Sequence, residues 1–159
     1  MRPARRLTGK TDRPHAVSHP TQTHIDKPLR RALTSVVERY PQLQLAILYG
    51  SCARGTQRPG SDVDLALAQS SRTAMDQDTL LDISLECSRR TGREVQLRDL
   101  ARAEGLFLKQ VLTTGVVLLS RDSTVRAELI IRMLDFDANM LPLVRMIRRS
   151  NRERLLAGR

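Results

Sequence analysis

The chain has very few aromatic side chains. Its 159 residues include two Tyr, two Phe and no Trp, so aromatic residues make up 3% of the sequence. Proteins that bind single-stranded nucleic acid usually stack bases on aromatic side chains, and this scarcity argues against such a surface. The longest apolar run, Leu45 to Tyr49, has five residues, whereas a membrane-spanning helix needs about 20. We therefore expect no membrane association.

Cysteine is also scarce. Cys52 and Cys87 are the only two cysteines, and their spacing does not match that of a metal site. We interpret them as reduced thiols of a cytoplasmic protein, because disulfides are rare in that compartment. The first residues lack the apolar core of a secretory signal, which agrees with a cytoplasmic location. His15, His19 and His24 have no cysteine or carboxylate cluster beside them, so we do not predict a metal site there.

Acidic residues are outnumbered, but unevenly along the chain. The net charge is +10. Residues 1–27 carry +4, residues 28–119 carry +2 and residues 120–159 carry +4. A nearly balanced centre argues against a dedicated nucleic-acid groove. We expect contact with nucleic acid at most through the basic tails or through a partner.

The pattern of apolar residues predicts one domain in which helices and strands alternate. Residues 1–26 are rich in Arg, Pro, Thr and His and are predicted to be a disordered basic tail. The fold class is α/β (α+β), with a small mixed sheet flanked by helices over residues 27–121. Strands are expected over 44–49, 62–68, 93–100 and 116–120; helices are expected from 27 to before Pro41, briefly from Ser51, over 75–90, over 101–113 and from 124 onward.

The C-terminal helical segment, residues 122–159, carries an apolar stripe. We expect this stripe to pack on its own domain or, alternatively, to dock a helical partner. Pro142 should kink or break the helix, because its ring removes an N–H donor and clashes with the preceding turn. The residues of the stripe are Ile130, Leu134, Leu141, Val144 and Ile147.

Two carboxylates at the start of the second predicted strand have no role in a hydrophobic core. Asp62 and Asp64 lie two residues apart, so their side chains share one face of a strand, roughly 6–7 Å apart along the backbone. Such carboxylates repel each other unless a cation lies between them, and Mg²⁺ prefers oxygen ligands of this kind. Gly50 allows close backbone approach, and Ser51 opens a helix where anions are favoured. With Arg54 one turn later, these residues predict a site for a triphosphate and a metal.

These motifs resemble a known family. The stretch "GSCARG" followed by "GSDVDLAL" is similar to the signature of the minimal nucleotidyltransferases of the DNA polymerase β superfamily. The later stretches "EVQLRDLARAEGLFLKQVLTTGVVLLSRD" and "RMLDFDANMLPLVRMIRRSNRERLLAGR" resemble the third strand onward and the C-terminal helical segment of that family. The resemblance covers residues 30–159 and is nearest to the antitoxins paired with HEPN-domain toxins.

The resemblance implies a nucleotidyltransferase fold and a function. Antitoxins of this group transfer AMP from ATP to a tyrosine of the toxin, which silences it. By residue match, Asp62 and Asp64 become the catalytic carboxylates and magnesium ligands. Gly50 and Ser51 hold the triphosphate, and Arg54 is a phosphate contact. The implied partners are a HEPN-type toxin and a nucleoside triphosphate, with ATP as substrate and Mg²⁺ as cofactor.

One position departs from the family pattern. The family usually has a third carboxylate on the strand after the second helix, and Gln96 stands there in this chain. An amide can coordinate a metal weakly but cannot act as a general base. Glu94 shares its strand face one pleat away, and Asp99 has the opposite parity and would need a bulge to point inward. We therefore expect an intact nucleotide site with weakened catalysis.

The sequence leaves other functions open. The main alternative is a catalytically degenerate relative that neutralises its partner by binding alone. A small-molecule enzyme, such as an antibiotic adenylyltransferase, is less favoured because those enzymes usually carry an additional helical domain for the substrate. A nucleic-acid-binding module is weaker still, because the central part is charge-balanced and aromatics are few.

Overall fold

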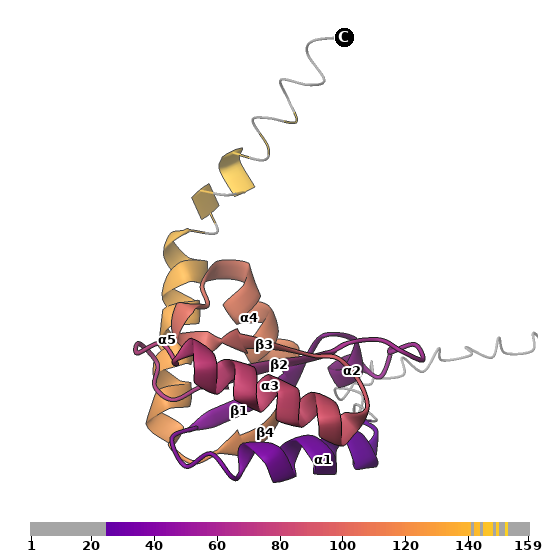
Figure 1. Ribbon diagram of the computed structural model, residues 1–159. Coiled ribbons are helices and arrows are strands. Elements are labelled where there is room, and N and C mark those ends of the chain that lie inside the picture. The colour runs from indigo at the N-terminus through magenta and orange to yellow at the C-terminus, as the bar shows by residue number, and fades with distance from the viewer. Residues whose placement is uncertain (1–24, 141, 144, 148, 150–151, 153–159) are drawn as a thin grey trace, which may run out of the picture.

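The computed structural model describes residues 25–140, 142–143, 145–147, 149 and 152. Helices and strands alternate along this part of the chain (Figure 1). The elements are α1 (Lys27–Val37), β1 (Leu45–Tyr49), α2 (Gly50–Arg54), β2 (Val63–Ala68), α3 (Gln77–Thr91), β3 (Val95–Asp99), the 3-10 helix η1 (Leu100–Arg102), α4 (Gly105–Thr114), β4 (Val116–Ser120) and α5 (Ser123–Asn139). The predicted tail falls almost entirely on residues 1–24, outside the described part.

The four strands form one mixed sheet in the order β3-β2-β1-β4. β1 lies in the centre and pairs antiparallel with both β2 and β4, whereas β2 and β3 are parallel. This arrangement brings the carboxyl end of β1 beside the amino ends of β2 and β3. In the register, Tyr49 is opposite Asp64, and Asp64 is opposite Gln96. The mixed sheet confirms the predicted fold class.

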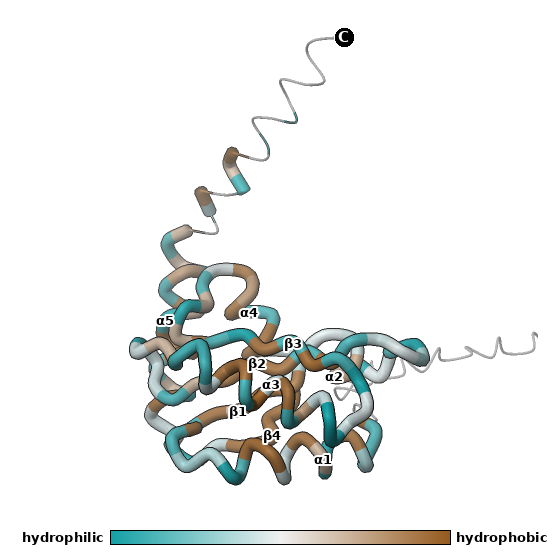
Figure 2. Tube along the Cα trace, viewed as in Figure 1, coloured by the Kyte–Doolittle hydropathy of each residue, from teal (hydrophilic) through white to brown (hydrophobic). Residues whose placement is uncertain are grey.

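Each face of the sheet is covered by two helices. One face carries Leu48, Val63 and Leu65 and packs on α1 and α3, which lie side by side in Figure 1. The other face carries Ile47 and Ala66 and packs on α4 and α5. β1, β2 and β4 are correspondingly hydrophobic, β3 alternates apolar and polar residues, and the connecting loops are mostly hydrophilic (Figure 2). Alternation of side chains along each strand separates the two cores.

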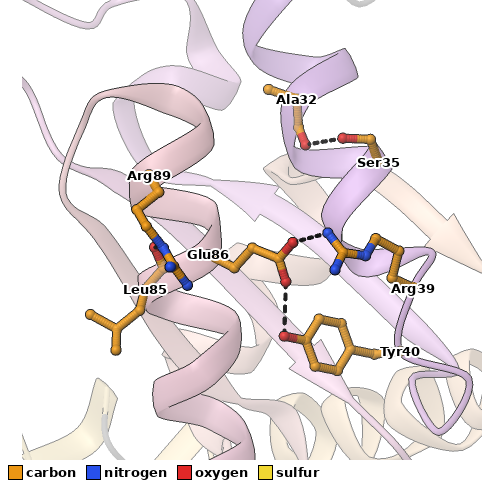
Figure 3. Close-up of polar contacts among 7 residues, drawn as sticks. All are labelled: Ala32, Ser35, Arg39, Tyr40, Leu85, Glu86 and Arg89. Carbon is orange, nitrogen blue, oxygen red and sulfur yellow. Dashed lines mark hydrogen bonds and ion pairs between the residues drawn. The ribbon is translucent and has the colours of Figure 1, made fainter.

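Polar contacts tie the elements together outside these cores. Glu86 on α3 pairs with Arg39 and accepts a hydrogen bond from the Tyr40 hydroxyl at 3.1 Å (Figure 3). Arg121, just after β4, donates to the backbone oxygens of Tyr40 and Leu43 at 2.7 and 2.9 Å. These contacts hold the loop after α1 in place.

Most predicted boundaries agree with the structure within two residues, but the predicted helix over 101–113 is wrong at its start. The chain forms the short η1 helix, passes through extended backbone at Ala103 and Glu104, and begins α4 at Gly105. Asp99 caps the start of η1, because its side chain accepts a hydrogen bond from the Ala101 N–H at 2.9 Å.

The apolar stripe predicted on α5 packs only in part on its own domain. The side chains that α5 buries are Val125, Leu129 and Met133. Leu134 is 53% exposed, and Ile130 is only partly buried. A helix turns 100° per residue, so a shift of one residue places Leu134 at the edge of the contact. Ile147 is exposed as well, whereas the predicted stripe residues Leu141 and Val144 lie outside the described residues.

α5 ends at Asn139, three residues before Pro142, which agrees with the break that this proline predicts. Over the described residues, no helix is long and apolar enough to cross a bilayer. Cys52 and Cys87 are both buried and free.

Candidate functional site

The Gly50-Ser51 turn lies where β1 passes directly into α2. Gly50 has a φ of +71°, a conformation that side chains with a Cβ rarely adopt. A Cβ built at Gly50 would lie 2.2 Å from Oδ2 of Asp64. Glycine is therefore required twice, by the backbone turn and by the carboxylate that fills the space of its missing side chain. The Gly-Ser turn and the Asp-x-Asp pair therefore lie directly beside each other.

Asp62 and Asp64 are held at the amino end of β2. Asp64 lies within the strand and is half-buried, whereas Asp62 just precedes it and is exposed. The pKa of Asp64 is raised, first by burial and next by the negative charge of Asp62. The two carboxylates therefore repel each other, as their spacing predicts. Arg54 and Arg98 partly offset this effect through their positive charge.

Ser51 and Arg54 occupy the two ends of the short helix α2. Ser51 is half-buried, and its hydroxyl has no hydrogen-bond partner among the residues that the structure describes. Arg54 is exposed on the last turn of α2, close enough to act on the charge of Asp64. The structure thus brings all five predicted site residues to the end of the sheet where β1 finishes and β2 begins.

Gln96 lies beside the carboxylates, at the position predicted for a third one. Its Cα is in register with that of Asp64, and its Nε2 donates a hydrogen bond to Oδ2 of Asp62 at 3.1 Å. This hydrogen bond therefore occupies one carboxylate oxygen of Asp62.

Neither neighbouring carboxylate replaces Gln96. Asp99 points to the opposite side of β3, as its parity predicts. Its Oδ2 accepts the Met75 N–H at 2.7 Å and its Oδ1 accepts the Ala101 N–H. Glu94 precedes β3 and is exposed. In the described part of the chain, no group of three His, Cys, Asp or Glu side chains comes together to hold a metal.

Two residues that the sequence analysis did not single out complete the surroundings of Asp64. Tyr49, the last residue of β1, is buried, and its ring makes an edge-to-face contact with Phe107 at 5.4 Å between centroids. Burial and the charge of Asp64 raise the pKa of the Tyr49 hydroxyl, and Arg98 opposes this by charge and hydrogen bonding. Tyr49, Asp64, Gln96 and Arg98 line a cavity of about 530 Å³.

Arg93 fixes the loop that carries Asp62. Its Nε donates to the backbone oxygen of Ser61 at 2.9 Å, and its Nη2 lies 3.2 Å from Sγ of Cys52. Cys52 is buried in α2, directly after the Gly50-Ser51 turn. Arg93 therefore connects both motifs to the start of β3. No local sequence pattern marks this role, because both partners of the Arg93 side chain, the Ser61 oxygen and the Cys52 sulfur, are distant in sequence.

The chemistry of these side chains fits a magnesium ion that arrives with a nucleotide. Mg²⁺ is typically bound by one or two carboxylates together with substrate phosphates and waters. Asp62 and Asp64 supply two carboxylates that repel each other. Gln96 adds a neutral amide, whose oxygen and nitrogen exchange places by a simple flip. Asp62, Asp64 and Gln96 are too few to hold a metal with protein ligands alone, but they suffice for a site in which the nucleotide phosphates supply the other ligands.

The family model described as polymerase β nucleotidyltransferase matches residues 31–124. The chain belongs to this nucleotidyltransferase family. The match runs from α1 to the start of α5, and so includes the whole sheet and every residue of the candidate site.

A curated relative is the protein adenylyltransferase MntA of Shewanella oneidensis. It is 31% identical over 78 residues, which are 49% of this chain and 55% of the relative. The chain thus matches little more than half the length of that relative.

Solved structures of toxin–antitoxin complexes share the fold. A chain of a toxin–antitoxin structure with AMP-PNP aligns with a TM-score of 0.60 at 21% identity, over 80% of this chain and 98% of that one. A chain from the complex of the tri-AMPylated HEPN toxin of Shewanella oneidensis with its MNT antitoxin aligns with a TM-score of 0.55 at 18% identity. That alignment covers 80% of this chain and 96% of the other. At these identities the likeness establishes the fold.

Proposed function

We propose that the chain is a Mg²⁺-dependent protein adenylyltransferase that acts as an antitoxin. It transfers AMP from ATP to a tyrosine hydroxyl of a partner HEPN toxin and so neutralises it. The observation that carries the proposal is the contact of Gly50 with Asp64, which builds the Gly-Ser turn and the Asp-x-Asp pair into one site. The family match and the similarity to a protein named adenylyltransferase support the same reaction.

The roles follow from the positions of the residues. Gly50, Ser51 and Arg54 bind the triphosphate, and Asp62 and Asp64 hold Mg²⁺ and are the catalytic carboxylates. The tyrosine oxygen forms a bond to the α-phosphorus while the bond to pyrophosphate breaks, and the proton passes to solvent because Gln96 cannot accept it. Bound Mg²⁺ would neutralise the developing negative charge of the phosphates. The cytoplasmic location inferred from cysteine usage stays a prediction.

The direct test is label transfer from α-labelled ATP to a purified HEPN-type toxin. We expect transfer that requires Mg²⁺ and falls more than about 100-fold in Asp62→Asn and Asp64→Asn. Asp82→Asn is a matched control, because Asp82 is an exposed carboxylate on α3. Label transfer that survives both substitutions at the site would contradict the assignment.

A binding-only antitoxin is the second candidate function. The hydrogen bond from Gln96 to Asp62 favours it, since a neutral amide occupies a carboxylate oxygen in a site that needs charge. The two functions separate in an assay of toxin activity with and without ATP. Neutralisation that needs ATP and survives removal of the antitoxin supports transfer. Neutralisation that is complete without ATP and is lost when the proteins are separated supports binding alone.

A further inference from the structure

Arg98 is a charged residue on the site face of β3 whose position the family motif does not explain. It is exposed and lies two residues beyond Gln96, with its Cα in register with Ala66. Its guanidinium influences both the Asp64 carboxylate and the Tyr49 hydroxyl, and all three line the same cavity. Arg98 therefore faces the space in which the transfer would take place.

Other arginines of the domain are used to hold the fold. Arg93, Arg121 and Arg132 each donate hydrogen bonds to backbone oxygens of distant segments. Within the described residues Arg98 makes no such bond, and the ion pairs found there join Arg39 to Glu86 and Lys109 to Asp137. The guanidinium of Arg98 hydrogen-bonds to the Tyr49 hydroxyl but pairs with no carboxylate of the described residues, so its positive charge is available to a ligand in the cavity that it lines with Asp64.

The charges around Asp64 are already balanced. Asp62 and Asp64 contribute two negative charges, and Arg54 and Arg98 are the two cations that act on Asp64. One divalent cation brought by a triphosphate adds to this set without a charge conflict. A second cation would have to use Asp64 together with Gln96, which lies in register with it. There it would gain no charge from the amide and would be repelled by Arg98.

We propose that the nucleotide site of this protein takes a single divalent cation, and that the guanidinium of Arg98 supplies the positive charge of a second one. The inference rests on the proposed function, because it concerns the same nucleotide site. Two-metal sites for phosphoryl and nucleotidyl transfer clamp both the attacking and the leaving oxygen. In this chain Arg98 is the residue that positions the nucleotide and neutralises its negative charge on the side of the site where Gln96 replaces a carboxylate.

The substitutions that reverse this arrangement are Gln96→Asp and Arg98→Gln. At the dielectric constant of water, a unit charge about 6 Å from a divalent cation changes the affinity for that cation about tenfold, so removing the charge of Arg98 should favour a second cation. Adding a carboxylate ligand at Gln96 strengthens the second site further. We therefore expect the double variant to bind one more cation than the wild type. Arg98→Lys keeps the charge and should behave as the wild type.

The experiment counts Mn²⁺ ions bound per protein by electron paramagnetic resonance in the presence of saturating α,β-methylene ATP, which cannot transfer AMP. We expect one Mn²⁺ for the wild type and for Arg98→Lys, and two for the double variant. Arg102→Gln is the matched control, since Arg102 lines the same cavity but is not among the charges that act on Asp64. It should retain one Mn²⁺.

The outcomes separate this inference from the proposed function. Two Mn²⁺ bound by the wild type, with the nucleotide, would overturn the role of Arg98 and leave the nucleotide site standing. One Mn²⁺ in a folded double variant would overturn it as well. Failure of the wild type to bind the nucleotide at any Mn²⁺ concentration would overturn both the inference and the proposed function.

Discussion

The two faces of the sheet use the same strands but end differently. On the face toward α1 and α3, apolar side chains continue to the amino end of β2 and β3, where Val63 and Val95 are still buried. On the face toward α4 and α5, the apolar cover ends at Ala66, and Asp64 and Gln96 follow. One face is closed along its whole length, and the other is left open at the end that carries the site.

The difference shows how a single strand serves stability and chemistry together. Side chains alternate along β2. Val63 and Leu65 therefore lie in one core, and Asp62 and Asp64 lie on the opposite side of the strand. Burial of these apolar side chains holds the strand in place and so keeps the two carboxylates close together, although they repel each other. Strain of this kind is often concentrated at functional sites and offset by the packing around them.

A side chain that fills the open end should remove the difference between the two faces. Gly50→Ala adds a Cβ at a φ of +71°, 2.2 Å from Oδ2 of Asp64. We expect a loss of about 2–4 kcal/mol in the free energy of unfolding, from backbone strain and from displacement of the carboxylate. Urea denaturation measures the loss, and nucleotide binding should disappear as well.

Gly60→Ala is the control for backbone strain. Gly60 has a φ of +81°, but a Cβ there would meet nothing within 4 Å. We expect a loss of about 1–2 kcal/mol from the backbone alone and unchanged nucleotide binding. Equal losses in the two variants would mean that the contact between Gly50 and Asp64 carries no energetic weight.

Much of this arrangement could be predicted from the sequence, because it depends on local periodicity. Alternating apolar residues indicated that Asp62 and Asp64 share a face and that Asp99 points away from it. The match to the family motif, rather than periodicity, placed Gln96 beside the carboxylates, where the register confirms it. Turn residues marked the Gly50-Ser51 junction.

The features that were missed depend on contacts between distant segments. The Arg93 side chain donates to one backbone oxygen, that of Ser61, 32 residues earlier in the chain, and such a partner leaves no pattern in the sequence. α5 packs on the second core through Val125, Leu129 and Met133, one residue away from the predicted stripe at Ile130 and Leu134. The position of Arg98 on the site face depends on the register of β3 with β2, which no local pattern predicts.

The closed face gives a second prediction, which concerns pH. Cys87 is fully buried in the core between α3 and the sheet, and burial, followed by the charge of Glu86, raises the pKa of its thiol from 9.0 to about 12. Below pH 9 the thiol is neutral in both the folded and the unfolded state. Between pH 9 and 12 the unfolded chain ionises first, so the folded state loses stability as the pH rises.

At pH 10 we expect this loss to be about 1 kcal/mol relative to pH 8. Cys87→Val removes the thiol while keeping an apolar side chain of similar size. The difference in unfolding free energy between wild type and Cys87→Val should therefore change with pH, while groups that titrate in both proteins cancel. A difference that stays constant from pH 8 to pH 10 would show that Cys87 ionises as easily in the folded protein as in the unfolded one.

The repulsion between Asp62 and Asp64 should have only a small effect on stability. Asp64→Asn removes one of two repelling charges from the open end, where burial and then the charge of Asp62 raise the pKa of Asp64. We expect the protein without nucleotide to become more stable at pH 7, by less than about 1 kcal/mol because solvent screens the pair. Added Mg²⁺ and ATP should then stabilise the wild type more than the variant, since ligands stabilise the state they bind. Thermal unfolding with and without both ligands measures the two effects. A variant that is less stable than the wild type without ligands would mean that the Asp64 carboxylate serves the fold rather than the site.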